Sequence, residues 1–220
     1  MCSYLLCVLV LICIGNKFVA SSVLPESEIN TLFDIYSATN GPNWTIPPQF
    51  TGQLWNFTGN FNPCADLWYG VYCSANVTVE DPFLHVEQLA MDSFNMRGFI
   101  PNSISNLSHL NRLYFGDNGL NGTIPKEIFE ISKLQYLDLS HNYLNGSIVI
   151  PDTITTTQLI ALNLINNELT ESIPATIGLL QNLTQIMLDN NHLNGSIPHE
   201  IGQLGDTMIC KLHLLLFDSL

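Results

Sequence analysis

Residues 110–125 read LNRLYFGDNGLNGTIP, and the same pattern returns three times further along the chain. The copies are LQYLDLSHNYLNGSI at 134–148, LIALNLINNELTESIP at 159–174 and LTQIMLDNNHLNGSIP at 183–198. The asparagine of the Leu-x-x-Leu-x-Leu-x-x-Asn-x-Leu core stands at positions 118, 142, 167 and 191, so the steps are 24, 25 and 24 residues. A core of this kind with a fixed period in this range predicts a solenoid built from stacked repeats.

Two repeats depart from the pattern. In the first, Phe94 stands in the asparagine slot, and terminal repeats are often atypical. The third carries two extra residues in the stretch IVIP at 148–151 and three threonines at 155–157. We predict about five repeats over residues 86–206 and a degenerate or truncated last repeat over residues 207–220.

Each repeat is expected to contribute one short strand, followed by a tight turn and an irregular or short helical return. In the second repeat, the side chains expected in the core are those of Leu113, Phe115, Leu120, Ile124, Ile128 and Ile131. The turn asparagines Asn118, Asn142, Asn167 and Asn191 are each followed two positions later by leucine, which indicates burial. Because buried polar groups must be hydrogen-bonded, we predict an asparagine ladder whose side chains bond the backbone of the adjacent turn.

The chain begins with a predicted signal peptide over residues 1–22. The unbroken apolar run at 4–14 is too short to span a bilayer but suits a signal-peptide core. Small residues near its end place the expected cleavage between Ala20 and Val23. Three of the six cysteines would leave with this segment.

An N-terminal cap is predicted over residues 23–85. Ile29, Leu32, Phe33 and Tyr36 have the spacing of one apolar helix face within residues 25–39, and Asn-Gly-Pro at 40–42 ends the helix. The aromatic-rich stretch 44–72 shows no period, so we interpret it as an irregular cap. Cys64 and Cys73 are close enough in sequence to form a disulfide in an oxidising compartment, whereas Cys210 has no evident partner.

The formal net charge of −13 excludes some classes of partner. Only 11% of the residues are charged and few are basic, which argues against binding to nucleic acid or an anionic membrane. The same charge mildly favours cationic partners, although it also serves solubility alone. The eight Asn-x-Ser/Thr sequons, which are candidate glycosylation sites, are Asn43, Asn56, Asn76, Asn106, Asn121, Asn145, Asn182 and Asn194.

We find no pattern that indicates catalysis. The histidines are scattered and none has a metal-ligand spacing, and no nucleophile or phosphate-binding motif is present. Asp117, Asp138 and Asp189 line the strand region, but solvated acidic surface explains them better than a paired-carboxylate site. We therefore predict no enzyme activity, no catalytic residue, no metal site and no cofactor.

Two independent motifs resemble one family. The Leu-x-Gly-x-Ile-Pro elements at 120–125 and 193–198 are similar to those of plant-type extracellular leucine-rich repeats. The cap stretches TNGPNW at 39–44 and NPCADLWYGVYC at 62–73 resemble the cap of the same family, so that the resemblance covers about residues 24–206. It implies an α/β solenoid: a right-handed arc with a parallel concave sheet, a second short sheet near the Ile-Pro turns, and an N-terminal helical disulfide cap.

The resemblance also implies extracellular recognition through the concave sheet. Members include the ectodomains of receptor-like kinases and receptor-like proteins, and polygalacturonase inhibitors. The paired cysteines of the family's C-terminal cap, a membrane span and a kinase segment are not found in the sequence. A truncated receptor ectodomain and a small secreted binder therefore both stay open.

Alternation along the strands identifies a candidate binding patch. Its members are Arg112, Tyr114, Tyr136, Asp138, Asn163 and Met187, which should face solvent on neighbouring strands. Tyrosine and arginine are enriched in interface hot spots, so we expect a partner to contact this patch. The alternative is an exposed ion pair between Arg112 and Asp138, with the tyrosines serving only as strand formers.

The sequence thus favours a non-catalytic, glycosylated recognition module that is secreted or lies at the extracellular face of the cell membrane. Its expected partner is an extracellular protein, peptide or glycan. A truncated receptor ectodomain in signal transduction, an inhibitor of polygalacturonase-type hydrolases and, more distantly, a structural matrix protein are alternatives. The ligand and the oligomeric state stay open.

Overall fold

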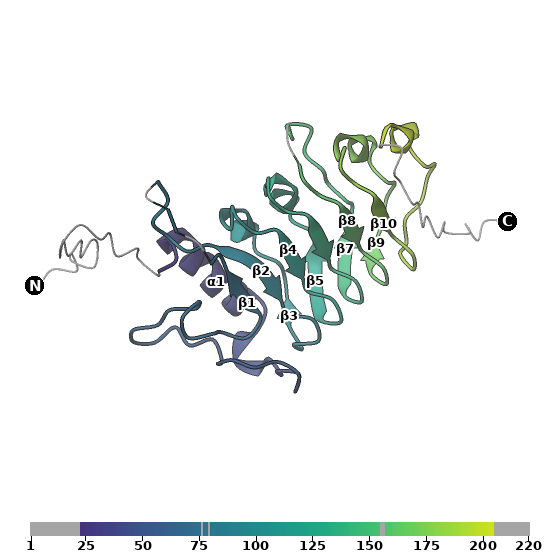
Figure 1. Cartoon of the computed structure of the whole chain (residues 1–220). Helices are drawn as coiled ribbons and strands as arrows, with labels where there is room; N and C mark the ends of the chain where they lie inside the picture. The colour runs from purple at the N-terminus through teal and green to yellow at the C-terminus, as the bar shows by residue number, and fades with distance from the viewer. Residues whose placement is uncertain (1–22, 76, 79, 155–156, 205–220) are drawn as a thin grey trace, which may run out of the picture.

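The structure, a computed structural model, describes residues 23–75, 77–78, 80–154 and 157–204. The predicted signal peptide, Asn76, Cys210 and the predicted last repeat over 207–220 lie outside these residues. Within them, the elements run from the N-terminal helix through a row of stacked turns (Figure 1). No helix of the described part of the chain is long and apolar enough to cross a membrane.

The concave sheet takes one short strand from each turn. Its strands, in order across the sheet, are β1 (Val71–Cys73), β2 (Val86–Ala90), β4 (Arg112–Tyr114), β6 (Tyr136–Asp138), β8 (Ala161–Asn163) and β10 (Gln185–Met187). The cap strand β1 is antiparallel to β2, and all other neighbours are parallel. Equivalent leucines stand in register, as Leu113 does with Leu137, so residues one repeat apart in the sequence lie side by side on neighbouring strands. The predicted solenoid is confirmed.

A second, smaller sheet runs along the turns that follow the ladder asparagines. It consists of β3 (Arg97–Gly98), β5 (Gly119–Thr123), β7 (Tyr143–Gly146) and β9 (Glu168–Leu169), all parallel. Four short 3-10 helices then return the chain: η2 (Asn102–Asn106), η3 (Lys126–Glu130), η4 (Ala175–Leu179) and η5 (His199–Gln203). Each follows a proline, whose fixed φ and missing N–H suit the start of a helix.

The third repeat has no such helix within described residues 147–154 and 157–160. This is the repeat with the two extra residues in its return segment. Consequently η2 packs against η3 and η4 against η5, but η3 and η4 make no comparable contact with each other.

One continuous apolar core runs along the solenoid. Leu113, Phe115 and Leu120 are fully buried, as are their counterparts in neighbouring turns. Phe94 is also fully buried and packs edge-on against Phe50, with ring centroids 5.1 Å apart. An aromatic side chain thus fills the asparagine slot where the first repeat meets the cap.

The cap helix α1 (Glu26–Ala38) forms close to where it was expected, and of its predicted apolar face Leu32 is fully buried and Ile29 and Tyr36 pack partly buried against the core, but Phe33 does not. The buried positions are Glu28, Thr31, Leu32 and Ile35, whereas Phe33 is 49% exposed and packs on Phe57. The buried face differs from the expected one because two polar residues are buried with partners. Thr31 donates to the carbonyls of Ser27 and Ser103, and Glu28 binds His85 and the N–H of Val86.

Four turn asparagines link neighbouring repeats through hydrogen bonds. Asn142 donates from Nδ2 to the carbonyls of Phe115, Leu139 and Ser140 at 2.9–3.1 Å, and its Oδ1 accepts from the N–H of Leu120 at 3.0 Å. Asn118, Asn167 and Asn191 repeat this arrangement. The side chains satisfy polar backbone groups that the turns would otherwise leave unpaired in a buried setting.

A disulfide joins Cys64 to Cys73, nine positions apart, and ties the irregular cap to β1. Removing it with paired Cys64→Ala and Cys73→Ala substitutions should lower the free energy of unfolding by about 2–3 kcal/mol, because a short closed loop restricts the unfolded chain. Urea unfolding under non-reducing conditions measures this loss. Reduction of the wild-type protein should reproduce it, and a loss below about 1 kcal/mol in both experiments would contradict the expectation.

Candidate interaction surface on the concave sheet

The six predicted patch residues lie on four neighbouring strands of the concave sheet. Arg112 is in register with Tyr136, and Tyr114 with Asp138. Asp138 is in turn opposite Asn163, which is opposite Met187. The row from Tyr114 to Met187 therefore crosses β4, β6, β8 and β10 without a gap. Arg112 is exposed and the other five side chains are half-buried.

Arg112 and Tyr136 contact each other at one edge of this row. The guanidinium carbon of Arg112 lies 5.4 Å from the centroid of the Tyr136 ring, a cation–π geometry. No salt bridge joins the described side chains of Arg112 and Asp138, so the ion-pair alternative is not what the structure contains. The contact fixes an aromatic ring and a positive charge side by side on the exposed face.

Asp138 is held by its neighbours on the sheet. Its Oδ1 accepts from the N–H and the hydroxyl of Ser140 at 2.9 and 2.6 Å, and its Oδ2 accepts from Asn163 Nδ2 at 2.8 Å. A carboxylate with three donors has a fixed orientation, which is the preorganisation that favours binding. Asp138 is therefore available to a partner mainly through its remaining lone pairs and its charge.

A second carboxylate, Asp92, belongs to the same face but was not included in the predicted patch. Its Oδ1 accepts from the N–H of Gly116 at 2.7 Å. Burial, with the nearby charges of Asp138 and Asp117, raises the pKa of Asp92 to about 6 despite that hydrogen bond. A Cβ at Gly116 would lie 3.1 Å from Asp92 Oδ1 and 3.4 Å from Asp138 Oδ1, so glycine lets the carboxylates converge. Asp92, Gly116 and Ser140 occupy the same position in successive repeats, so the sequence could have indicated that they lie together.

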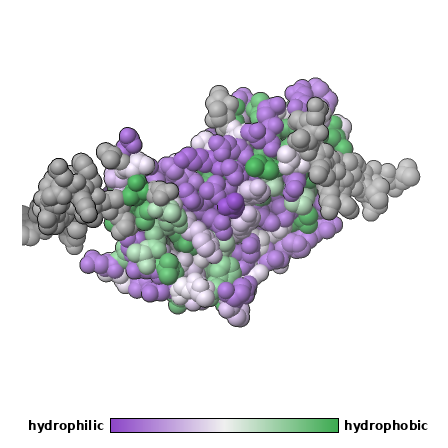
Figure 2. All heavy atoms as spheres, in the orientation of Figure 1, coloured by the Kyte–Doolittle hydropathy of each residue, from purple (hydrophilic) through white to green (hydrophobic). Residues whose placement is uncertain are grey.

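Polar side chains also form a column along the turns that follow the concave strands. Each belongs to the residue directly before a ladder asparagine. Asn190 donates to Asn166 at 2.6 Å, Asn166 contacts the His141 ring at 3.1 Å, and His141 lies 3.9 Å from Asp117. All four backbones have φ between 52° and 55°. Asparagine and aspartate tolerate this left-handed conformation better than most residues. The face is thus acidic and rich in amides, and Figure 2 shows hydrophilic residues across the middle of the visible side.

The cap holds a separate cluster of titratable groups that sequence spacing did not reveal. His85 Nδ1 lies 2.5 Å from Glu28 Oε1, and His85 Nε2 lies 3.0 Å from Asp81 Oδ2. The His109 ring stacks on His85, with centroids 3.8 Å apart and planes 20° apart. Glu28 is 57 residues from His85, so no local motif could signal the contact.

The electrostatics of this cluster favour a positive charge on His85 and not on His109. Burial alone would lower the pKa of His85, but the hydrogen bonds and charges of Glu28 and Asp81 together raise it above its usual range. Burial and the positive charge of His85 lower the pKa of His109. Burial also raises the pKa of Glu28, although the hydrogen bonds with the N–H of Val86 and with His85 act to lower it.

Glu28, His85 and His109 bring potential metal-ligand atoms within 4.8 Å of one another. The geometry nevertheless suits a proton better than a metal ion. Each nitrogen of His85 already faces a carboxylate. The two stacked rings are nearly parallel, so their nitrogen lone pairs run side by side and do not converge on a common point.

Comparison with known proteins supports the repeat assignment. The leucine-rich repeat family model matches residues 133–156 and 182–204. No curated protein sequence matches the chain significantly.

Several solved structures are similar to this chain. The ectodomain of the receptor kinase SOBIR1 from Arabidopsis thaliana has a TM-score of 0.65 at 24% identity, covering 84% of this chain and 90% of that one. A chain of the BIR3–SERK2 complex from the same plant has a TM-score of 0.61 at 27% identity, with 82% and 90% covered. The plant peptide hormone receptor RGFR1, in complex with RGF2, has a TM-score of 0.50 at 41% identity, but only 53% of this chain and 18% of that one are covered.

The repeat period, the two parallel sheets, the disulfide-closed cap and these similarities agree with one another. The chain is a leucine-rich repeat protein, and its repeats and disulfide-closed cap resemble those of plant receptor ectodomains.

Proposed function

We propose that this chain is a non-catalytic extracellular recognition module that binds a protein or peptide partner on its concave sheet. The observation that carries the proposal is the continuous row from Tyr114 to Met187, flanked by the Arg112–Tyr136 contact. Polar groups held in fixed orientations beside half-buried aromatic side chains and an exposed cation are the composition of an interface centre.

The charges of this face define the kind of partner. The negative charges of Asp117 and Asp138 help to raise the pKa of Asp92, and Arg112 is an exposed cation at the edge of the patch. A segment with a basic side chain would neutralise the carboxylates, while a carboxyl or carbonyl group of the same partner would meet Arg112. Such complementarity chiefly sets specificity and association rate.

The similar structures support a protein or peptide partner over a glycan. The BIR3–SERK2 structure is a complex between two proteins, and RGFR1 is described as a peptide hormone receptor in complex with RGF2. These similarities also favour a second candidate function, in which this chain is the extracellular part of a receptor. Both functions require binding by the same face.

Binding is expected to depend on the two patch tyrosines. The purified chain is first screened by biolayer interferometry against synthetic basic peptides and purified plant ectodomains. For any partner found, a Tyr114→Ala, Tyr136→Ala variant should weaken the affinity by about 30-fold or more, since hot-spot residues each contribute about 1–2 kcal/mol or more.

Tyr143, which is 59% exposed on the second sheet, provides the matched control. Tyr143→Ala should leave the affinity unchanged. If the double variant binds as tightly as the wild-type chain, the partner does not use the concave patch and the proposal is wrong.

A further inference from the structure

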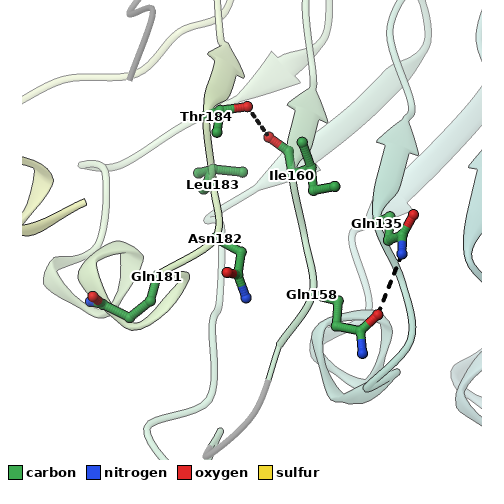
Figure 3. Close-up of a pocket in the computed structure, with 7 residues that line it drawn as sticks. All are labelled: Gln135, Gln158, Ile160, Gln181, Asn182, Leu183 and Thr184. Carbon is green, nitrogen blue, oxygen red and sulfur yellow. Dashed lines mark hydrogen bonds between the residues drawn. The ribbon is translucent and has the colours of Figure 1, made fainter. Parts of the chain in front are cut away.

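A polar cavity of about 450 Å³ lies outside the concave patch, where the chain enters β6, β8 and β10 (Figure 3). Carboxamide side chains dominate its lining, namely Gln135, Gln158, Gln181 and Asn182. None of the lining residues is charged. The cavity is open to solvent, and its amides can both donate and accept hydrogen bonds to neutral hydroxyl or acetamido groups.

The irregular third repeat explains why the cavity exists. The return helices η3 and η4 flank a repeat that has none among its described residues, so they do not pack together as the other helix pairs do. Gln158 ends this repeat and lies between Gln135, where the chain enters β6, and Gln181, which precedes β10 (Figure 3). Gln135 donates to Gln158 at 3.4 Å, a weak contact that leaves both amides able to bind something else.

A glycosylation sequon forms part of the same lining. Asn182, Leu183 and Thr184 all line the cavity, and Asn182 is exposed. Asn182 Nδ2, the atom that a glycan would modify, donates to the carbonyl of Thr157 at 2.7 Å. An N-linked asparagine keeps one N–H, so this hydrogen bond can persist and would orient the first sugar.

We propose that the cavity is the seat of an N-glycan on Asn182, whose first N-acetylhexosamine packs among the three glutamines and braces the repeat that has no helix. In the attachment step, Asn182 Nδ2 bonds to the sugar C1 of an oligosaccharyl diphosphate lipid. The bond from C1 to the diphosphate breaks, the amide loses one proton, and the lipid diphosphate leaves. This proposal is independent of binding on the concave sheet.

The experiment uses the full chain produced in plant cells and purified from the secretory fraction. Glycopeptide mass spectrometry should find Asn182 occupied, and nuclear Overhauser contacts should join the first sugar to the side-chain amides of Gln158 or Gln135. Trimming every glycan to one sugar with an endoglycosidase should leave the melting temperature unchanged. Asn182→Gln should lower it by about 2–4 °C.

Two controls separate the glycan from other effects. Asn194 is an exposed sequon asparagine that does not line the cavity, so Asn194→Gln should lose its glycan without a change in melting temperature. In unglycosylated protein from bacteria, Asn182→Gln reports only the loss of the bond to Thr157, and its effect should be smaller. An unmodified Asn182, absent sugar contacts, or equal shifts for the two variants in plant-derived protein would each overturn the proposal.

Discussion

An Asn142→Ala variant is expected to have a free energy of unfolding about 3–5 kcal/mol below that of the wild-type protein. The substitution leaves the buried N–H of Leu120 without its acceptor and removes the donor shared by three carbonyls. An unsatisfied buried polar group costs about 1–3 kcal/mol, and the missing side chain adds a small cavity. Urea unfolding followed by circular dichroism measures the change.

The position of Asn142 in the stack makes the loss more than local. Its partners Phe115 and Leu120 belong to one repeat and Leu139 to the next, so the side chain joins two neighbours. In a solenoid, stability is approximately the sum of repeat terms and nearest-neighbour interface terms. Hydrogen exchange should therefore accelerate first in the repeats on either side of residue 142.

Two further variants test whether the hydrogen bonds are responsible. Asn121→Ala removes the same side chain from an exposed position and should change the stability by less than about 0.5 kcal/mol. Asn142→Asp keeps an acceptor for the N–H of Leu120, but it places a carboxylate oxygen opposite three carbonyl oxygens. Because these groups repel one another, the variant should be as damaging as alanine at neutral pH. If Asn142→Ala stays within about 1 kcal/mol of wild type, the ladder does not stabilise the fold as its geometry implies.

The repeating part of the molecule could be predicted because its determinants are local and recur. Each turn presents large apolar residues at the Leu-x-x-Leu-x-Leu offsets, so alternation alone identifies Leu113 and Phe115 as buried and Arg112 and Tyr114 as solvent-facing. The register across strands then follows from the period, because the leucines must align to share one core. This reasoning also placed the six patch residues on neighbouring strands.

The pairings among side chains could not be predicted in the same way. The period places Arg112 near both Tyr136 and Asp138, but which one it contacts depends on rotamers and on the donors that already occupy Asp138. The cap is less predictable still, because it does not repeat. Hydrophobic periodicity treats Glu28 as a solvent-facing residue, and only the distant partner His85 explains its burial.

Replacing Glu28 with alanine is expected to lower the free energy of unfolding by about 3–5 kcal/mol at pH 6, as is typical when one member of a buried charge pair is removed. Glu28 is 1% exposed, and its two oxygens bind the His85 ring and the N–H of Val86. The variant leaves Nδ1 of His85 and the N–H of Val86 without their partner between helix α1 and the first repeat, while Nε2 of His85 keeps its contact with Asp81. Glu26→Ala, at an exposed position on the same helix, is the matched control.

Glu28→Gln tests the charge separately from the packing. In the wild-type protein the raised pKa of His85 means that the folded state holds its proton more tightly than the unfolded state, whose value is 6.5. The resulting stability is present below pH 6.5 and is lost as the pH rises through the folded value. The lowered pKa of His109 and of Asp81 places their titrations below this window, whereas Asp92, with a pKa of about 6, titrates at its lower edge.

The wild-type protein should therefore lose stability as the pH rises above 6.5, whereas Glu28→Gln should lose much less over the same range. Glutamine keeps an acceptor for Val86 but offers no charge to His85, so the histidine pKa should fall. Imidazole nitrogen shifts in an NMR titration follow His85 directly, and urea unfolding at several pH values follows the stability. If His85 titrates alike in both proteins and their stabilities run parallel with pH, the carboxylate of Glu28 does not hold the charge of His85. The contact between helix and solenoid would then be one of packing alone.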